Sequence, residues 1–453
     1  MDVDHYDLSK VIGERAIANA MSFSIEAEYD PSGDQEKAIE EIIFQLENGQ
    51  ERCVLLGVTG SGKTFAMAHI IQRLQIPTLI LSHNKTLARQ LWQEMSSLFP
   101  SNAVEYFVSY YDYYQPEAYK PSTDTYIEKE VLLNEEIDRL RLKALSALLT
   151  RRDVVIVATV SCIYGIGAPK DYDRNKFSFR CGDLIERDEI LRRLIDIYYR
   201  RNDIELQRGC FRVRGDVIEI VPASEETAVR IELFGDEIDA ITIIDTITGE
   251  TLQKRDEMAL FPAKAYVTGD EQVEAACNGI LQELQHRLLD LQENNKLVEA
   301  HRLEKRTKYD VEMIREMGFC PGIENYTRYM DGREAGSQPW TLMDYFPDDY
   351  LLFIDESHVT IPQVRGMYGG DRSRKENLVE HGFRLPSAFD NRPLVFKEFE
   401  GQMGYTIFVS ATPGDYELGR SDGVYVEQVI RPTGLVDPQI DIRPLTGQID
   451  NLL

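Results

Sequence analysis

The sequence contains little that marks an exported or membrane protein. No run among its 453 residues approaches the roughly 18 apolar residues that cross a bilayer. The first residues, Met1-Asp2-Val3-Asp4, lack the apolar segment of a secretory signal. The cysteines stand singly, with no Cys-x-x-Cys pair, at positions 53, 162, 181, 210, 277 and 320. We therefore expect a cytoplasmic protein with reduced thiols, no zinc site and no membrane contact.

Positive charge is also scarce. Asp and Glu number 77 against 50 Lys and Arg, which gives a formal net charge of −27. A protein that held nucleic acid by its overall field would be basic, whereas acidity by itself favours solubility. Any binding of DNA would therefore need a local groove, with stacking as well as charge. The hydrophobic content of 43% is ordinary for a globular protein, and the length allows two to four domains.

The clearest motif is a glycine-rich stretch at residues 57–64. It reads G-x-x-x-x-G-K-T, follows the apolar run 53–56 and precedes a helical pattern over 65–74. Strand, glycine loop and helix in this order are typical of a P-loop, which binds the phosphates of a nucleoside triphosphate. Lys63 would reach the β- and γ-phosphates, and the Thr64 hydroxyl would ligate Mg²⁺. The alternative is a glycine turn without a ligand. The expected nucleotide-contacting residues are Gly57, Val58, Thr59, Gly60, Ser61, Gly62, Lys63 and Thr64.

Five apolar runs alternate with helical stretches and predict a doubly wound parallel sheet in an α/β fold. The runs are 53–56, 78–82, 154–160, 351–354 and 406–409. The polar residues that follow each run would then meet at the carboxyl edge of the sheet, where ligands bind in such folds.

An acidic pair, Asp355-Glu356, follows the fourth run and predicts the second half of the nucleotide site. Asp355 would hold the hydrated Mg²⁺, and Glu356 would orient or deprotonate the attacking water. The alternative is an acidic strand end that faces solvent. The expected catalytic set is therefore Lys63, Asp355 and Glu356. The span from Lys63 to Asp355 exceeds the about 100–200 residues of one α/β domain, so we expect insertions between them.

The first expected insertion is rich in tyrosine. Tyrosines fill both phases of a strand pattern, with Pro and Gln between them, at positions 110, 111, 113, 114, 119 and 126. This pattern favours a projecting β-hairpin over a core strand, which would bury one phase. Aromatic side chains on a hairpin can stack on bases or wedge between DNA strands. The alternative is an aromatic patch that packs against another domain.

The second expected insertion, residues 175–265, alternates apolar and polar residues as half-buried antiparallel strands do. Arg212 and Arg214 fall on the same phase of one strand, which we expect to be exposed. A solvated face is one interpretation, and a protein-docking face is the other. Residues 280–317 form a charged helical stretch, for which we expect a structural role as scaffold.

With these motifs in place, the chain resembles the UvrB family, the damage-verification subunit of bacterial nucleotide excision repair, from about residue 29 to its end. The P-loop and the Ser-Ala-Thr motif alone are typical of all superfamily 2 helicases, whereas the tyrosine stretch and the Phe-Arg-Val-Arg-Gly-Asp strand are specific. The motifs are Gly33-Asp34-Gln35, the P-loop, His83-Asn84-Lys85-Thr86-Leu87, the tyrosine stretch, Phe211-Arg212-Val213-Arg214-Gly215-Asp216, Gly322-Ile323-Glu324-Asn325-Tyr326, Asp355-Glu356-Ser357-His358, Leu385-Pro386-Ser387-Ala388, Asp390-Asn391-Arg392-Pro393-Leu394 and Ser410-Ala411-Thr412-Pro413.

The resemblance implies a RecA-like, helicase-type parallel-sheet domain that binds ATP and Mg²⁺ and carries an inserted β-hairpin and an inserted α+β domain. It implies that Gln35 contacts adenine and that the hairpin tyrosines enter damaged duplex DNA. It also implies that Arg212 and Arg214 dock UvrA, which loads the protein, and that UvrC is then recruited for incision.

The same resemblance implies how the chain is divided. The first motor domain is expected to occupy residues 1–109, 128–174 and 346–430. The segments inserted into it are the hairpin at 110–127, the UvrA-docking domain at 175–265 and a helical insert at 266–345, and a linker would begin at 431–453. Glu36 and Phe389 depart from the family pattern, in which we expect Pro and Leu. Members of the family continue into a second motor domain with the arginines that complete the ATP site. We therefore expect a truncated chain with weak hydrolysis. A processive translocase and a non-catalytic docking module are the alternatives.

Overall fold

The computed structural model describes residues 22–266, 270–432 and 439–452. Its centre is a seven-stranded sheet of order β19-β1-β18-β17-β2-β8-β3, in which all neighbouring strands are parallel. The strands are β1 (Arg52–Gly57), β2 (Thr78–Ser82), β3 (Ala103–Phe107), β8 (Val154–Thr159), β17 (Leu351–Asp355), β18 (Tyr405–Ser410) and β19 (Val426–Gln428). The predicted parallel α/β sheet is confirmed, and all five apolar runs are strands in it.

Helices cover both faces of this sheet, which explains why its strands are apolar in both phases. Alternate side chains of the strands face α2 (Gln35–Glu47), α3 (Lys63–Leu74) and α4 (Lys85–Leu98) in one core. The other phase packs mainly against α5 (Glu135–Thr150), α11 (Ser357–Glu380) and α12 (Phe396–Gln402). Phe353 and Phe408, both fully buried, lie in different cores because they point to opposite faces. The short helices η2 (Val160–Ile163), η4 (Leu342–Tyr345) and α13 (Asp415–Arg420) also belong to this domain, and α14 (Gln448–Leu452) is the last described helix.

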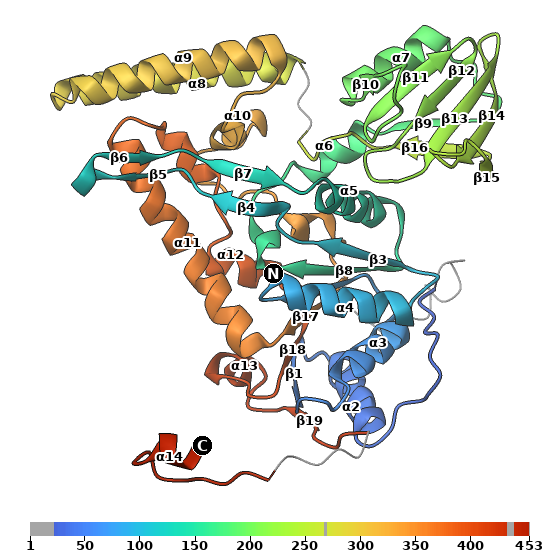
Figure 1. Cartoon of the computed structure of the whole chain (residues 1–453), viewed down its shortest axis with the longest axis vertical. Helices are drawn as coiled ribbons and strands as arrows, with labels where there is room; N and C mark the ends of the chain where they lie inside the picture. Colours follow the sequence, from blue (N-terminus) through green and yellow to red (C-terminus); the bar gives the residue numbers. More distant parts are fainter. Residues whose placement is uncertain (1–21, 267–269, 433–438, 453) are drawn as a thin grey trace.

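A long β-hairpin leaves the sheet after β3 (Figure 1). Strand β4 (Tyr111–Gln115) pairs antiparallel with β7 (Glu130–Leu133), and β5 (Ala118–Lys120) pairs with β6 (Thr125–Ile127) around η1 (Pro121–Thr123). The paired strands therefore extend to residue 133, beyond the expected end at 127. The expectation was too short because β7, which closes the hairpin, contains no tyrosine.

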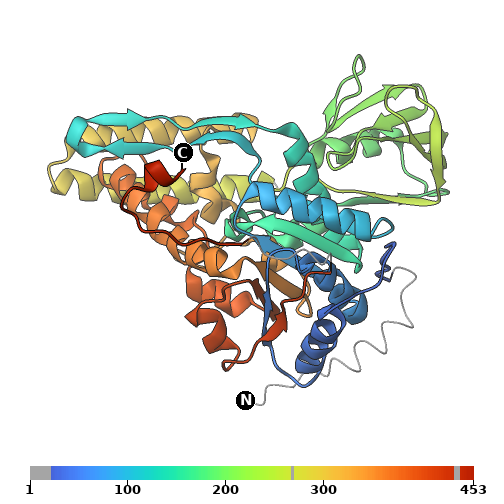
Figure 2. The ribbon, with the colours of Figure 1, turned by 60° about the horizontal axis from the view of Figure 1, so that its bottom comes forward.

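The second insertion is a separate α+β unit at one side of the molecule (Figures 1 and 2). Its six-stranded sheet has the order β10-β11-β12-β13-β14-β15, and a two-stranded sheet of β9 and β16 lies beside it. Helix α6 (Pro169–Arg174), whose Tyr172 packs in the core of the central sheet, leads into this unit. The elements of the unit are β9 (Phe177–Arg180), α7 (Arg187–Asp196), β10 (Arg200–Arg201), β11 (Cys210–Arg214), β12 (Val217–Ile220), β13 (Ala228–Phe234), β14 (Glu237–Ile244), β15 (Thr251–Arg255) and β16 (Glu257–Leu260). The unit has its own hydrophobic core, around Phe211 and Ile231.

A helical unit follows and reaches toward the hairpin (Figure 1). Helices α8 (Asp270–Glu293) and α9 (Leu297–Met317) form a pair, continued by η3 (Ile323–Tyr326), α10 (Thr327–Met330) and η5 (Pro386–Asp390). Their shared core includes Leu284, Leu303 and Leu385. Among the described helices, none has the length and apolar character to cross a membrane.

Candidate functional site

The P-loop lies between β1 and α3 at the carboxyl edge of the sheet. Gly60 and Gly62 have φ angles of 83° and 82°, a region that glycine adopts without strain. A Cβ atom at Gly57 would lie 2.6 Å from Cγ of Lys63, so a side chain there would displace the lysine. The loop ends at Gly62, the N-cap of α3, where the helix dipole favours an anion.

Lys63 joins this loop to the acidic pair. Its Nζ donates a hydrogen bond of 3.0 Å to the Gly57 carbonyl and lies 3.8 Å from Oε1 of Glu356. Strand order explains the contact, since β18 alone separates β1 from β17 and all three strands end at one edge. The structure therefore brings together the predicted residues Lys63 and Glu356, with Asp355 immediately before Glu356.

The two carboxylates of the acidic pair differ in environment. Asp355 is buried, and burial together with the neighbouring Glu356 raises its pKa to about 6, although Lys63 opposes the shift. Glu356 has a φ of 43°, an uncommon conformation for a residue with a Cβ, of the kind that clusters at functional sites. A divalent cation would offset the buried negative charge of Asp355.

Oxygen ligands fit Mg²⁺ here. Mg²⁺ is usually held by one or two carboxylates, waters and the substrate's own phosphates rather than by an all-protein cage. Within the described ranges, no three His, Cys, Asp or Glu side chains converge to form such a cage. The Thr64 hydroxyl, one residue into α3, and the Asp355 carboxylate are the protein groups that could hold the ion.

His358 links the acidic pair to the Ser-Ala-Thr motif. Its Nδ1 lies 2.8 Å from Oγ of Ser410 and 3.6 Å from Oε2 of Glu356. The Thr412 N–H donates to the same Ser410 Oγ at 2.9 Å. These contacts tie the ends of β17 and β18 together. Both residues belong to motifs of the sequence, but the pattern predicted no role for either side chain; the available signal was polar residues after two apolar runs.

Gln35 lies against the P-loop rather than in open solvent. Its Nε2 donates to the Ser61 carbonyl at 2.9 Å, and its Oε1 accepts the Ser32 N–H at 3.0 Å. A Cβ at Gly62 would lie 2.3 Å from this nitrogen, so Gly62 leaves room for the amide. The amide thus supports the loop in this structure, and its contact with adenine stays a prediction.

The hairpin tyrosines form two groups. Near the base, Tyr110, Tyr111 and Tyr114 pack in series, with ring centroids 4.4 and 4.9 Å apart. Tyr113 and Tyr114 are about half exposed, at 50% and 49%. Together, Tyr110, Tyr111, Tyr113 and Tyr114 present an aromatic surface that could stack on bases.

The tip tyrosines are packed inward. Tyr119 and Tyr126 lie on the ring of Phe383, with centroid distances of 4.8 and 4.5 Å, and the Tyr126 ring is stacked parallel to it. For these two residues the alternative holds, in which tyrosines pack against another part of the chain. Phe383 lies too far along the sequence to have been predicted as their partner.

Buried ion pairs hold the hairpin on the helical unit. Arg384 Nε donates to Glu117 Oε2 at 2.8 Å, and its Nη1 lies 3.5 Å from Asp310. Both Arg384 and Glu117 are buried. A second, half-exposed pair joins Lys129 to Glu324 at 2.6 Å. None of these contacts was predicted, because they join residues far apart in the sequence.

The two arginines of β11 differ in exposure. Arg214 is exposed, but Arg212 is half-buried and its Nε donates to the Glu219 carboxylate. The expectation that both lie on a free face is thus wrong for Arg212, because the antiparallel register puts Glu219 directly opposite it. Burial alone would raise the pKa of Glu219, yet Arg212 and Arg230 hold it below its usual value.

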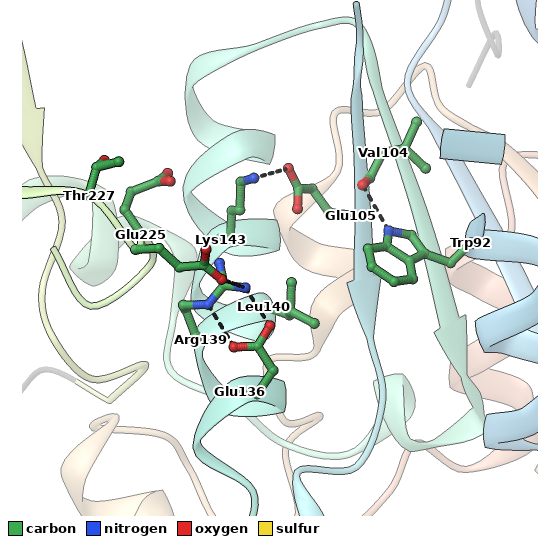
Figure 3. Close-up of a pocket in the computed structure, with 10 residues that line it drawn as sticks. Trp92, Val104, Glu105, Glu136, Arg139, Leu140, Lys143, Glu225 and Thr227 are labelled. Atoms are coloured by element: carbon green, nitrogen blue, oxygen red, sulfur yellow. Dashed lines mark hydrogen bonds and ion pairs between the residues drawn. The ribbon is translucent and has the colours of Figure 1, made fainter. Parts of the chain in front are cut away.

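A cavity of about 350 Å³ lies where the second insertion meets the central-sheet domain, and none of its lining residues belongs to the P-loop or the acidic pair (Figure 3). Arg139 of α5 reaches Glu226 of the insertion at 2.9 Å. Burial raises the pKa of Glu105 on β3 to about 7, although Lys143, 3.6 Å away, opposes this. The cavity walls are therefore ionic on both sides of the joint.

Comparison with known proteins agrees with this architecture. Residues 28–158 match the family model of the Type III restriction enzyme res subunit, 177–266 that of the UvrB interaction domain, and 271–332 that of the UvrB third helical domain. Relatives described as UvrABC system protein B are 61%, 59% and 58% identical in Natranaerobius thermophilus, Geobacillus kaustophilus and Bacillus subtilis. The matches cover 95% of this chain and 65%, 66% and 65% of these relatives. The expected resemblance is thus confirmed: over 95% of its length the chain is similar to UvrABC system protein B, and it spans about two thirds of the length of these relatives.

Proposed function

We propose that the chain is the ATP-binding and DNA-contacting part of a damage-verification subunit in nucleotide excision repair, acting within a UvrABC-type system. The contact of Lys63 with Glu356, in a chain 61% identical to a UvrABC system protein B, carries the proposal. It joins a phosphate-binding lysine to a base candidate on the neighbouring loop, and ATP chemistry needs both.

Each residue of the nucleotide site has a proposed part. The glycine loop and Lys63 bind the triphosphate, Thr64 and Asp355 hold Mg²⁺, and Glu356 orients the attacking water. When bound, Mg²⁺ neutralises charge on the phosphates. His358, through its contact with Ser410, positions Glu356.

The DNA contact is proposed for the hairpin. Tyr110, Tyr111, Tyr113 and Tyr114 stack on bases, and the hairpin separates the strands of damaged duplex. Tyr119 and Tyr126 act differently, since they pack on Phe383 and hold the tip in place. ATP turnover changes the position of the motor relative to the DNA, and a bulky lesion resists passage.

Partners are proposed by the same reasoning. The unit at 175–265, which matches the UvrB interaction domain, docks UvrA through Arg214 and its neighbours. Arg212 contributes by holding Glu219 rather than by direct contact. UvrC is recruited afterwards for incision, in the cytoplasm.

We also propose that these 453 residues hydrolyse ATP weakly by themselves. The resemblance implies that arginines of a second motor domain complete the site, and the chain spans 65% of the relatives' length. An arginine of this kind is worth about 10³–10⁵ in rate in related NTPases.

Nucleotide binding tests the proposal first. We expect the wild-type chain to bind a fluorescent ADP or ATP in the presence of Mg²⁺ and to turn it over slowly, with or without lesion-bearing duplex. Lys63→Ala should lose at least tenfold in affinity, whereas Lys37→Ala, an exposed lysine of α2, should not. Absence of binding by the wild-type chain, or equal binding by Lys63→Ala, would contradict the site. Fast turnover would contradict only the weak hydrolysis.

Removal of the hairpin distinguishes the proposed function from that of a processive translocase. Replacing residues 112–132 by a short turn should abolish stable complexes with lesion-bearing DNA and leave nucleotide binding unchanged. If stable complexes persist without the hairpin, a translocating motor becomes the better interpretation.

A further inference from the structure

The strand β19 returns the chain to the P-loop from a distant part of the sequence. Gln428, its last residue, stands beside Gly57 in parallel register, and the Val58 N–H donates to the Gln428 carbonyl at 3.2 Å. The side chain of Gln428 is fully buried. Neither this strand nor this glutamine is predicted from the sequence pattern.

Two side-chain amides converge on one carbonyl of the loop. Gln428 Nε2 donates to the Ser61 carbonyl at 2.7 Å, and Gln35 Nε2 donates to the same oxygen at 2.9 Å. A carbonyl oxygen has two lone pairs, so both bonds can form at once. The Ser61 residue is itself fully buried, and its Oγ donates to the Val58 carbonyl at 2.9 Å.

These bonds fix the direction of the Ser61–Gly62 peptide. In a trans peptide the C=O and the following N–H point to opposite sides. With the Ser61 oxygen held toward the two amides, the Gly62 N–H must point away from them. Glycines on both sides of Ser61, at positive φ, would otherwise let this peptide rotate.

We propose that Gln428 is a positioning residue of the phosphate site, which acts with Gln35 to aim the Gly62 N–H at the nucleotide's phosphates. This inference rests on the proposed function and deepens it. Gln428 touches the loop and not the ligand, so its effect does not depend on the base.

Two further observations favour a positioning role over a purely structural one. Within the described part of the chain, the bond from Gln428 Nε2 to the Ser61 carbonyl is the hydrogen bond that its buried side chain makes, so its polar contact is with the loop. The residues after Gln428 also form hydrogen bonds with the P-loop and with Asp34, the residue before Gln35. Asp34 Oδ2 accepts the N–H groups of Val429 and Ile430 at 2.7 and 3.0 Å, and Arg431 Nε donates to the Thr59 carbonyl at 2.8 Å.

Two variants test the proposal. Gln428→Leu removes the donor at similar size, and Gln428→Glu puts an acceptor opposite the Ser61 oxygen. We expect about 5- to 20-fold weaker binding of Mg²⁺-bound fluorescent ADP for Gln428→Leu, and a larger loss for Gln428→Glu, with the same fold-loss for fluorescent GDP. Gln402→Leu is the matched control, because Gln402 also donates from Nε2, to Asp344 at 2.8 Å, and also leaves Oε1 unpartnered among the described residues.

The melting temperature of the nucleotide-free protein separates positioning from folding. A loss of affinity at an unchanged melting temperature supports the proposal. Unchanged affinity in Gln428→Leu overturns it and leaves the proposed function standing, whereas a wild-type chain that binds no nucleotide overturns both. If the variants melt early, hydrogen exchange of the wild type decides. Slower exchange of residues 428–431 on adding nucleotide supports the coupling, and no change overturns it.

Discussion

At the scale of single residues, the acidic pair shows how one site gives two carboxylates different properties. Asp355 is buried, and the charges of Glu356 and Lys63 act on it in opposite directions. Glu356 instead has direct contacts, with Lys63 at 3.8 Å and His358 at 3.6 Å. The sequence motif predicted both positions. It could not predict the burial of Asp355, because burial depends on the elements that pack around the strand end.

The raised pKa of Asp355 predicts that the protein becomes less stable to unfolding as pH rises. Its folded-state pKa is about 6 against an ordinary 3.8, so the folded state holds the proton to higher pH than the unfolded state does. The free energy of unfolding therefore falls as pH rises from about 4 to 6, by on the order of 1–3 kcal/mol. Asp355→Asn should melt higher than the wild type at pH 8, and the difference should vanish near pH 4.

Mg²⁺ and ADP provide the control for this prediction. They should raise the melting temperature of the wild type at pH 8 and raise that of Asp355→Asn much less, because the amide cannot replace the charged ligand. An Asp355→Asn variant that is less stable than the wild type at pH 8 without ligand would show that the carboxylate has a stabilising partner.

At the scale of elements, apolar runs in the sequence predicted the five central strands but not the two edge strands of the sheet, β3 and β19. The five predicted runs are continuous because helices cover both faces of the sheet. β3 contains Glu105, and β19 has only three residues with Glu and Gln among them, so neither gives a strong signal. The hairpin was predicted from its tyrosines. Its ion pairs with Arg384 and Glu324 could not be predicted, because pairs between residues far apart in the sequence leave no local pattern.

The buried pair of Glu117 and Arg384 predicts that the hairpin can be detached selectively. Glu117→Gln removes the nearer carboxylate of buried Arg384, at 2.8 Å, and leaves Asp310 at 3.5 Å; breaking a buried pair costs about 3–5 kcal/mol. In this variant we expect hydrogen exchange to become faster over residues 111–133 and to stay almost unchanged in the central sheet. Lys129→Ala, which breaks a half-exposed pair, should cost about 0–1 kcal/mol and change exchange little. Equal effects of the two variants would contradict the importance of burial.

Glu105 makes the joint between α5 and the second insertion sensitive to pH. Its pKa of about 7, against an ordinary 4.5, means that the folded state binds the extra proton between these values. Stability from this group is lost as pH rises from about 4.5 to 7. Glu105→Gln should therefore raise the melting temperature at pH 8 more than at pH 5. Glu136→Gln is the control, since Arg139 holds the pKa of Glu136 below its usual value and the effect should not have this sign.

At the scale of the whole molecule, the acidic balance and the aromatic hairpin together constrain how the proposed DNA contact would form. A net charge of −27 opposes attraction of DNA from a distance, so the proposed affinity would come from contacts within a small region. The exposed rings of Tyr113 and Tyr114 offer stacking, which depends weakly on salt. Composition predicted this much, but which tyrosines remain exposed was decided by the packing of Tyr119 and Tyr126 on Phe383.

This balance predicts a shallow salt dependence for DNA binding. Each phosphate neutralised by a cation adds about 0.7–0.9 to the slope of log K against log salt concentration, so stacking should give a slope well below the about 10 of a charge-driven binder. We expect a slope of about 2–4 from anisotropy titrations between 50 and 200 mM salt on duplex with an unpaired segment. Tyr113→Ala with Tyr114→Ala should weaken binding by at least tenfold at unchanged slope, since stacking on each ring is worth about 1–3 kcal/mol. A steep slope that the tyrosine substitutions leave intact would mean that cations elsewhere on the surface hold the DNA and that the hairpin acts only after binding.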